Sequence, residues 1–223
     1  FQGDEAERAA HTNMLIDEGI VGLCVDKDLR LVYASSSSVY GICSDSVLTE
    51  DHDISPIGPY AAAKAESEKK ILHGLKENSI ILRLSAPYGP RQRTRTVLRL
   101  FIERAFANLD LMYHGSGERT QDFTSADDIG NAICCAVSSI DINGIFNIAS
   151  GKPISMRDLA ELVVRTVPGT RSKVVPSGQP DLQKNYRAAF DISKAKRMLG
   201  WQPSVSLEEG IRQWVQCLKR GAR

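Results

Sequence analysis

Short apolar segments alternate with longer helical segments along most of the chain, and this alternation limits the fold more than any other feature. The segments LRLVYAS (29–35), SIILRLS (79–85) and GIFNIAS (144–150) are typical of strands buried in a parallel sheet. We therefore predict an α/β fold with a largely parallel sheet. The predicted helices cover 4–19, 60–77, 96–109, 125–140, 155–167, 191–199 and 206–220, and shorter strands cover 109–114 and 172–176.

The composition is that of an ordinary globular protein, with 42% hydrophobic and 25% charged residues among 223. The formal net charge is +1 and basic residues are scattered, so we expect neither a nucleic-acid nor a membrane partner. No apolar run approaches the roughly 18 residues of a membrane span, and no signal-peptide pattern opens the chain. The five cysteines and four histidines lack metal-ligand spacing, so we expect reduced thiols, no metal site and a cytoplasmic protein.

The segment YASSSSVYG (33–41) ends the first predicted strand, and Tyr60 and Lys64 open the next predicted helix. Residues four apart on a helix share a face. A lysine charge about 4 Å from a tyrosine hydroxyl is worth roughly 4 kcal/mol at an effective dielectric near 20, which lowers the tyrosine pKa by up to about 3 units. The pair is therefore a candidate general base near neutral pH, with a serine hydroxyl at the strand end to bind the same substrate oxygen.

Each of these features also has an ordinary structural interpretation. Tyrosine and lysine occur four residues apart by chance on many helices. Serines that follow a strand commonly form turns. Their occurrence together, in this order, favours the catalytic interpretation over the structural one.

Six segments resemble the extended short-chain dehydrogenase/reductases, and among them the NAD-dependent nucleotide-sugar epimerases such as UDP-galactose and UDP-glucuronate 4-epimerases. The resemblance runs from about Asn13 onward and implies the C-terminal part of a doubly wound, Rossmann-like parallel sheet with a smaller α/β substrate-binding portion. The segments are VYASSSSVYG, SPIGPYAAAKAESE, LRLSAPYGPRQR, GSGERTQDFTSADDI, FNIASGKPISMRDLAEL and FDISKAKRMLGWQPSVSLEEGI.

The resemblance implies a reaction without net redox change. Ser36, four residues before Tyr40, is implied as the catalytic serine, Tyr60 as the general base, and Lys64 as the residue that binds the nicotinamide ribose. Tyr60, assisted by Ser36, would take the proton of the sugar 4-hydroxyl while NAD accepts the hydride from C4. The 4-keto sugar would then turn over, and the hydride would return to its other face.

The resemblance also implies the cofactor NAD, a nucleotide-sugar substrate and a homodimer. The residues expected to bind the cofactor are Asn13, Ala34, Ser36, Tyr60, Lys64 and Ser85. Those expected to bind the substrate are Ser37, Ala86, His114, Gln121 and Arg187.

The type of reaction is predicted from the residues that follow Ser36. The 4,6-dehydratases of this family typically carry an Asp-Glu pair there for water elimination, whereas this chain has Ser37 and Ser38. We therefore favour 4-epimerisation of a UDP-sugar. Ala86 and Gln121 stand where family members often have asparagine and arginine. A reductase or dehydratase of the same family and a non-catalytic binding module stay open as alternatives.

The glycine-rich turn that holds a dinucleotide pyrophosphate is missing from the sequence. We therefore expect this chain to bind NAD weakly or not at all, and to leave a sheet edge uncovered beside residues 29–35. The expected organisation is a tag remnant at 1–3, the remainder of the dinucleotide-binding domain at 4–88 and 118–150, and the substrate-binding portion at 89–117 and 151–223.

Overall fold

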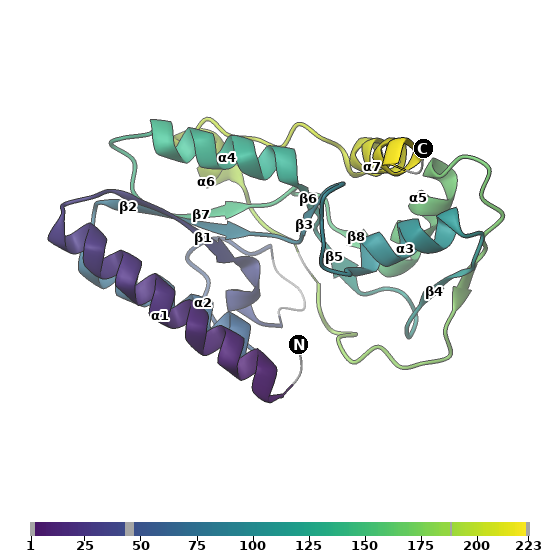
Figure 1. Cartoon of the computed structure of the whole chain (residues 1–223), viewed down its shortest axis with the longest axis horizontal. Coiled ribbons are helices and arrows are strands. Elements are labelled where there is room, and N and C mark those ends of the chain that lie inside the picture. Colours follow the sequence, from purple (N-terminus) through teal and green to yellow (C-terminus); the bar gives the residue numbers. More distant parts are fainter. Residues whose placement is uncertain (1–2, 43–46, 188, 222–223) are drawn as a thin grey trace.

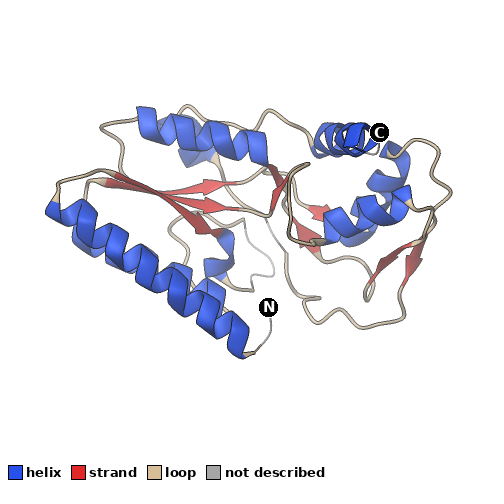
Figure 2. Ribbon diagram, viewed as in Figure 1, coloured by secondary structure: helices blue, strands red, loops and turns tan. Residues whose placement is uncertain are grey.

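A parallel three-stranded sheet in the order β1-β2-β7 forms the larger part of the molecule, with α1 and α2 on one face and α4 and α6 on the other (Figure 1, Figure 2). The computed structural model describes residues 3–42, 47–187 and 189–221, so Phe1 and Gln2 of the expected tag remnant lie outside it. No helix in these ranges has the length and apolar character that a membrane crossing requires. The elements of this part are α1 (Asp4–Asp26), β1 (Leu31–Ser36), the 3-10 helix η1 (Ser37–Tyr40), α2 (Pro59–Leu75), β2 (Ser79–Leu84), α4 (Ala126–Ser138), β7 (Gly144–Ile148) and α6 (Ser193–Met198).

Successive residues of each strand face opposite layers, which explains why the strands are apolar on both sides. Leu82 and Phe146 pack with α4 and α6 and are 1% and 0% exposed. Tyr33 and Ile81, on the other face, pack against α1 and α2. The three strands predicted from the sequence and their parallel pairing are therefore confirmed.

Helix α1 is longer than the sequence predicts. Gly19 and Gly22 indicate a connection after residue 19, but this prediction is wrong, because the helix continues to Asp26. Val21 and Cys24 are buried against α2 in one apolar cluster. This burial offsets the roughly 1 kcal/mol that each glycine costs inside a helix.

A smaller α/β part contains three helices and several short strands that pair two by two. Strand β4 pairs with β9 in parallel, β5 pairs with β8 antiparallel, and β3 pairs with β6 in parallel. Leu98, Phe101, Leu159 and Trp214 form its core between α3, α5 and α7. Its elements are β3 (Pro87–Tyr88), α3 (Val97–Phe106), β4 (Leu111–Tyr113), β5 (Thr120–Gln121), β6 (Thr124–Ser125), β8 (Ile154–Ser155), α5 (Met156–Thr166), β9 (Val174–Pro176) and α7 (Leu207–Gly221).

The segment around α6 packs with the sheet, although it falls in the range 151–223 that the sequence analysis assigns to substrate binding. Ala195, Leu199 and Trp201 are buried in the same cluster as Phe146 of β7. The indole Nε1 of Trp201 donates to the carbonyl oxygen of Asp128 at 2.9 Å. The chain thus returns to α4 before it enters α7.

The buried carboxylate of Asp128 fastens the connection between α6 and α7 to the start of α4. Its Oδ1 accepts from the backbone N–H and the hydroxyl of Ser204, each at 2.8 Å. Its Oδ2 accepts from the hydroxyl of Ser125 at 2.9 Å and from the backbone N–H of Val205 at 3.1 Å. Burial by itself raises the pKa of Asp128, but these hydrogen bonds outweigh it and hold the pKa below the ordinary value.

We expect Asp128→Asn to lower the free energy of unfolding by about 1–3 kcal/mol at neutral pH, because an amide nitrogen cannot accept these hydrogen bonds. A carboxylate with a depressed folded-state pKa stabilises above its ordinary pKa of 3.8, and the stabilisation is lost as the pH falls through the lower folded value. Urea unfolding at pH 7, 5 and 3 should therefore show the two proteins converging in acid.

The matched control is Asp158→Asn. Asp158 accepts from the hydroxyl of Ser155 in the same Ser-x-x-Asp arrangement, but it is exposed at the start of α5. We expect Asp158→Asn to lower the free energy of unfolding by less than Asp128→Asn does. An Asp128→Asn deficit that stays constant down to pH 3 would contradict the role of the Asp128 charge.

Candidate functional site

A row of buried polar residues crosses the sheet near the carboxyl ends of its strands. Ser35, Arg83 and Asn147 are register partners on β1, β2 and β7. They are 3%, 4% and 1% exposed. Polar side chains at such depth need partners, and each of these finds them on the face that α2 covers.

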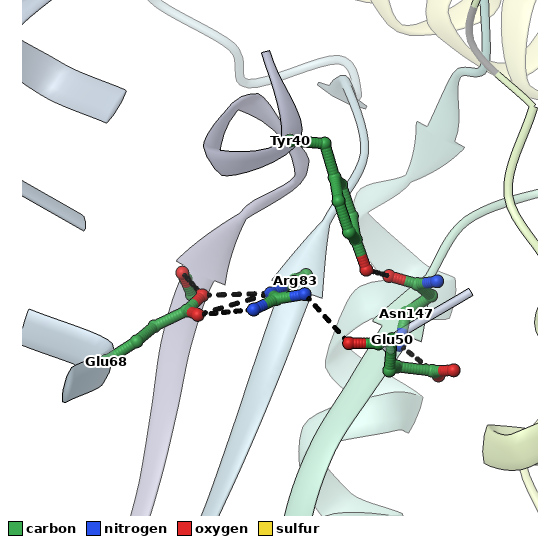
Figure 3. A network of polar contacts seen from close by, with 6 residues as sticks. Tyr40, Glu50, Glu68, Arg83 and Asn147 are labelled. Atoms are coloured by element: carbon green, nitrogen blue, oxygen red, sulfur yellow. Dashed lines mark hydrogen bonds and ion pairs between the residues drawn. The ribbon is translucent and has the colours of Figure 1, made fainter. Parts of the chain in front are cut away.

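Arg83 and Glu68 of α2 form a buried ion pair (Figure 3). The Nη2 of Arg83 donates to Glu68 Oε2 at 2.7 Å, and the Nε donates to both carboxylate oxygens at 3.2 Å. The hydroxyl of Ser35 donates to the same carboxylate. Burial alone lowers the pKa of Arg83, but the carboxylate of Glu68 outweighs burial and raises it. The pair therefore ties α2 to two strands.

The same polar row fixes the segments that follow β1. The hydroxyl of Tyr40 donates to Asn147 Oδ1 at 2.7 Å, and Arg83 lies 4.7 Å from the Tyr40 ring centroid (Figure 3). The backbone N–H of Asn147 donates to Glu50 Oε1 at 2.8 Å, and its amide Nδ2 donates to the carbonyl oxygen of Leu48 at 2.9 Å. Both η1 and the segment 48–50 are thereby held at the carboxyl end of the sheet.

Ser36 is the last residue of β1 and the N-cap of η1. Its hydroxyl accepts from the backbone N–H of Ser38 at 3.2 Å and lies 2.9 Å from the Ser38 hydroxyl. Ser36 is partly exposed, whereas Ser37 is only 7% exposed. Of the two serines, Ser36 is thus the more accessible to a ligand.

Tyr60 and Lys64 lie in the first turns of α2, one helical turn apart. The ring of Tyr60 is 52% exposed. The ammonium of Lys64 donates to the hydroxyl of Tyr33 at 2.9 Å and to the carbonyl oxygen of Ala34 at 3.1 Å. Burial lowers the pKa of Lys64, and the charges of Asp17 and Glu68 oppose this effect. A hydroxyl, a phenol and an ammonium thus come from the end of β1 and the start of α2.

The other residues expected to bind the cofactor lie in different environments. Asn13 is exposed on α1. Ala34 is exposed on β1, and its carbonyl oxygen binds Lys64. Ser85 is 2% exposed, and its hydroxyl donates to the carbonyl oxygen of Asp122 at 2.8 Å. Ala34 and Lys64 therefore lie together at the strand end that carries Ser36. The buried hydroxyl of Ser85, in contrast, is already hydrogen-bonded to the backbone of Asp122.

His114, expected to contact the substrate, lines a cavity of about 410 Å³ in the smaller part of the molecule. Its Nδ1 lies 2.6 Å from the hydroxyl of Ser177. Arg119 lines the same cavity and pairs with Asp181 at 3.0 Å. The remaining lining residues come from α3, β4, α5 and the segment before α3, and include Arg95, Thr96, Val97, Tyr113 and Met156.

Gln121 and Arg187, also expected to bind the substrate, lie on neighbouring segments. Thr120, the residue beside Gln121 on β5, forms an isolated β-bridge with Arg187. The guanidinium of Arg187 donates to the carbonyl oxygen of Glu118. Ala86 follows β2 and adopts a positive φ of 25°. The cavity around His114 is not lined by Gln121, Arg187 or Ala86.

Sequence reasoning missed several residues that the fold brings to the site or beside it. Asp17, Tyr33 and Arg83 were not predicted, because their partners lie on other elements and no local spacing identifies them. Asp122 is fully buried, and burial raises its pKa. Among the described residues no cluster of three or more histidine, cysteine, aspartate or glutamate side chains could hold a metal ion.

The sequence profile of the family described as GDP-mannose 4,6 dehydratase matches residues 10–214. The chain is 32% identical to a putative UDP-glucose 4-epimerase of Methanocaldococcus jannaschii over 203 residues, which are 87% of this chain and 64% of that protein. It is 31% identical to the UDP-glucuronate 4-epimerase of Thermodesulfobacterium geofontis, over 85% of this chain and 59% of that protein. The chain therefore belongs to this family of nucleotide-sugar epimerases and dehydratases.

Solved structures agree with this family. The UDP-glucose 4-epimerase of Thermotoga maritima with UDP-glucose superposes with a TM-score of 0.87 at 26% identity, over 98% of this chain and 73% of that one. The UDP-glucuronic acid 4-epimerase of Bacillus cereus with NAD gives a TM-score of 0.83 at 25% identity, over 100% of this chain and 72% of that one. The chain spans 51% to 68% of the length of the curated relatives compared.

We expect Glu68→Gln to destabilise the fold by about 3–5 kcal/mol, because it leaves the Arg83 guanidinium buried without its counter-charge. The double variant Glu68→Met with Arg83→Met should lose less free energy of unfolding than Glu68→Met alone, because it leaves no unpaired buried charge. Glu66→Gln is the control, since Glu66 pairs with Lys69 at 3.9 Å on the exposed side of α2. Urea unfolding measures all four variants, and a double variant that loses at least as much stability as Glu68→Met alone would contradict the coupling.

Proposed function

We propose that this chain carries the catalytic and substrate-binding residues of an NAD-dependent nucleotide-sugar 4-epimerase. The observation that supports this most is that Lys64, one turn after Tyr60 on α2, donates to the carbonyl oxygen of Ala34, two residues before Ser36 at the end of β1. In open α/β sheets, ligands bind outside the carboxyl ends of the strands. The family membership supports the same class of reaction.

In the proposed mechanism Tyr60 removes the proton from the sugar 4-hydroxyl, and Ser36 donates a hydrogen bond to the same oxygen. Tyr60 suits this role because its ring is 52% exposed at the start of α2. Lys64, one helical turn after Tyr60, places its ammonium at the end of β1, where it donates to the carbonyl oxygen of Ala34. Tyr60 returns this proton to the sugar oxygen once C4 has been inverted, while Ser36 again donates a hydrogen bond to that oxygen, so no net proton is gained or lost.

The cofactor that the family implies is NAD, which supplies the hydride acceptor and donor for C4 when bound. The residues that fit its nicotinamide ribose are Ala34, Ser36 and Lys64, since they offer a carbonyl oxygen, a hydroxyl and an ammonium at one strand end. The sequence of 223 residues has no Gly-x-x-Gly-x-x-Gly turn for the pyrophosphate. Weak binding of NAD by this chain alone therefore stays a prediction, which calorimetric titration tests.

Epimerisation, rather than elimination of water, is favoured by the residues after Ser36. Ser37 is 7% exposed, and the Ser38 hydroxyl lies 2.9 Å from that of Ser36. Neither serine can supply the acid or the base that elimination needs, because an alcohol is a far weaker acid than a carboxylic acid and a far weaker base than a carboxylate near neutral pH.

The proposal includes a homodimer in the cytoplasm. Leu15 and Ile16 of α1 are each 55% exposed, and Leu23 is 53% exposed. Apolar side chains gathered on one helix commonly mark a contact surface. Sedimentation equilibrium measures the mass of the assembly, and a monomer at all concentrations would contradict this part of the proposal.

The test of the reaction uses a protein that carries these residues together with a complete cofactor-binding segment. Incubated with NAD and UDP-glucose, it should form UDP-galactose while the total NADH stays constant. Proton NMR of the sugars and absorbance at the NADH band follow the two quantities. Steady consumption or production of NADH would favour a reductase, and loss of water from the sugar would favour a dehydratase.

In the same protein we expect Tyr60→Phe to lower turnover by about 10²- to 10⁴-fold, the usual contribution of a general acid-base group. Substrate binding and thermal stability should change little, because the Tyr60 ring is largely exposed. Tyr88→Phe is the control, since it removes a buried hydroxyl for which no hydrogen-bond partner is found among the described residues. Turnover of Tyr60→Phe at the parent rate would remove Tyr60 from the mechanism.

The nucleotide is proposed to bind in the cavity lined by His114 and Arg119. We expect His114→Ala to weaken UDP binding about tenfold, because a stacked aromatic contact is worth roughly 1 kcal/mol. Calorimetric titration with UDP needs no NAD and measures this directly. His73→Ala, an exposed histidine on α2, is the control, and equal effects of the two variants would contradict the proposed nucleotide site.

A further inference from the structure

The hydrogen bonds of Lys64 continue beyond Tyr33 to a carboxylate on another helix. The hydroxyl of Tyr33 donates to Asp17 Oδ2 of α1 at 2.5 Å. The hydroxyl of Ser67, which is 2% exposed on α2, donates to the same oxygen at 2.7 Å. Residues from α1, β1 and α2 therefore form one polar chain that ends on Asp17.

The direction of these hydrogen bonds is fixed by the chemistry of the groups. An ammonium can only donate and an ionised carboxylate can only accept. Tyr33 must therefore accept from Lys64 and donate to Asp17. Its ring is 8% exposed and its centroid lies 4.4 Å from the Lys64 ammonium. The phenol thus connects the positive charge to the negative one without direct contact between them.

The charges of two carboxylates, Asp17 and Glu68, act on the Lys64 ammonium, and only one of the two carboxylates is already in an ion pair. Glu68 of α2 is already bound by the Arg83 guanidinium. Asp17 of α1 forms no ion pair within the described ranges. Burial favours the neutral amine of Lys64, and the charge of Asp17 is the first influence that opposes it.

We propose that Asp17 is the counter-charge of Lys64 and acts through the hydroxyl of Tyr33. It holds the ammonium at the carboxyl end of β1, where Lys64 also binds the carbonyl oxygen of Ala34. Asp17 is in this sense a positioning residue, since it reaches the site only through another side chain. The effect of Asp17 on turnover rests on the proposed function. Its effect on the protonation of Lys64 is independent of that function.

The proposal predicts the ionisation of Lys64 in the chain of 223 residues. In Asp17→Asn the amide can still accept from Tyr33 and Ser67, but the negative charge is gone. The pKa of Lys64 should then fall by about one unit or more, as expected when an opposite charge nearby is lost. NMR of lysine labelled at Cε and Nζ measures this pKa, and the signal is assigned by its absence in Lys64→Arg.

Glu18→Gln is the matched control, because Glu18 follows Asp17 on α1 and contacts Lys70 at 3.2 Å instead. It should leave the pKa of Lys64 unchanged. Tyr33→Phe keeps the ring and removes the connecting hydroxyl, and it should also lower the pKa of Lys64. This variant carries the test if Asp17→Asn does not fold.

The proposal is overturned if Asp17→Asn leaves the pKa of Lys64 unchanged, or if Glu18→Gln lowers it equally. It is overturned as well if the pKa of Lys64 in Tyr33→Phe equals that of the parent. In the complete enzyme, Asp17→Asn should lower the upper pH limit of turnover, because Lys64 loses its proton at lower pH. Absence of epimerase activity would refute the proposed function and leave the NMR result standing.

Discussion

The buried ion pair between Arg83 and Glu68 is the interaction on which the rest of the site depends. A guanidinium on the central strand cannot stay buried without a counter-charge, and only α2 supplies one to it in the described part of the chain. Glu68 lies one turn after Lys64 and two turns after Tyr60 on the same helix face. Fixing Glu68 therefore fixes the rotation of α2, and with it the direction of the two residues proposed to do the chemistry. The hydroxyl of Ser35 donates to the same carboxylate, so the end of β1 is also held in place against α2.

A second carboxylate balances the charges around the site. With Glu68 committed to Arg83, Lys64 reaches Asp17 through the phenol of Tyr33. The polar core beneath the site thus contains two cation–carboxylate pairs, one direct and fully buried, the other bridged and half-buried. Separate pairing keeps each charge satisfied without placing like charges in contact. It also leaves Ser36 at the edge of the network, where the described hydrogen bonds of its hydroxyl go to Ser38 and can be exchanged for a ligand.

Much of the larger part of the fold could be predicted from the sequence, because buried parallel strands and helix caps have local signatures. The apolar segments at 29–35, 79–85 and 144–150 form β1, β2 and β7, and Ser125 caps α4 as its position before two aspartates indicates. The two-residue strands β3, β5, β6 and β8 have no such signature, since they are too short to show a period. The extension of α1 through Gly22 could not be predicted either, because burial of the helix against α2 outweighs the low helix propensity of glycine.

The sequence by itself determined the family, the order of the longer elements and the three residues proposed for catalysis, because short motifs with fixed spacing carry this information. Only the tertiary structure decided what surrounds them. Asp17, Tyr33 and Lys64 are 16 and 31 residues apart along the chain and meet because α1 and α2 pack side by side on one face of the sheet. The joining of Ser35, Arg83 and Asn147 in one row depends on strand register, which no single segment encodes. Hydrogen bonds and charge pairing act over a few ångströms in space, so distance along the sequence cannot reveal them.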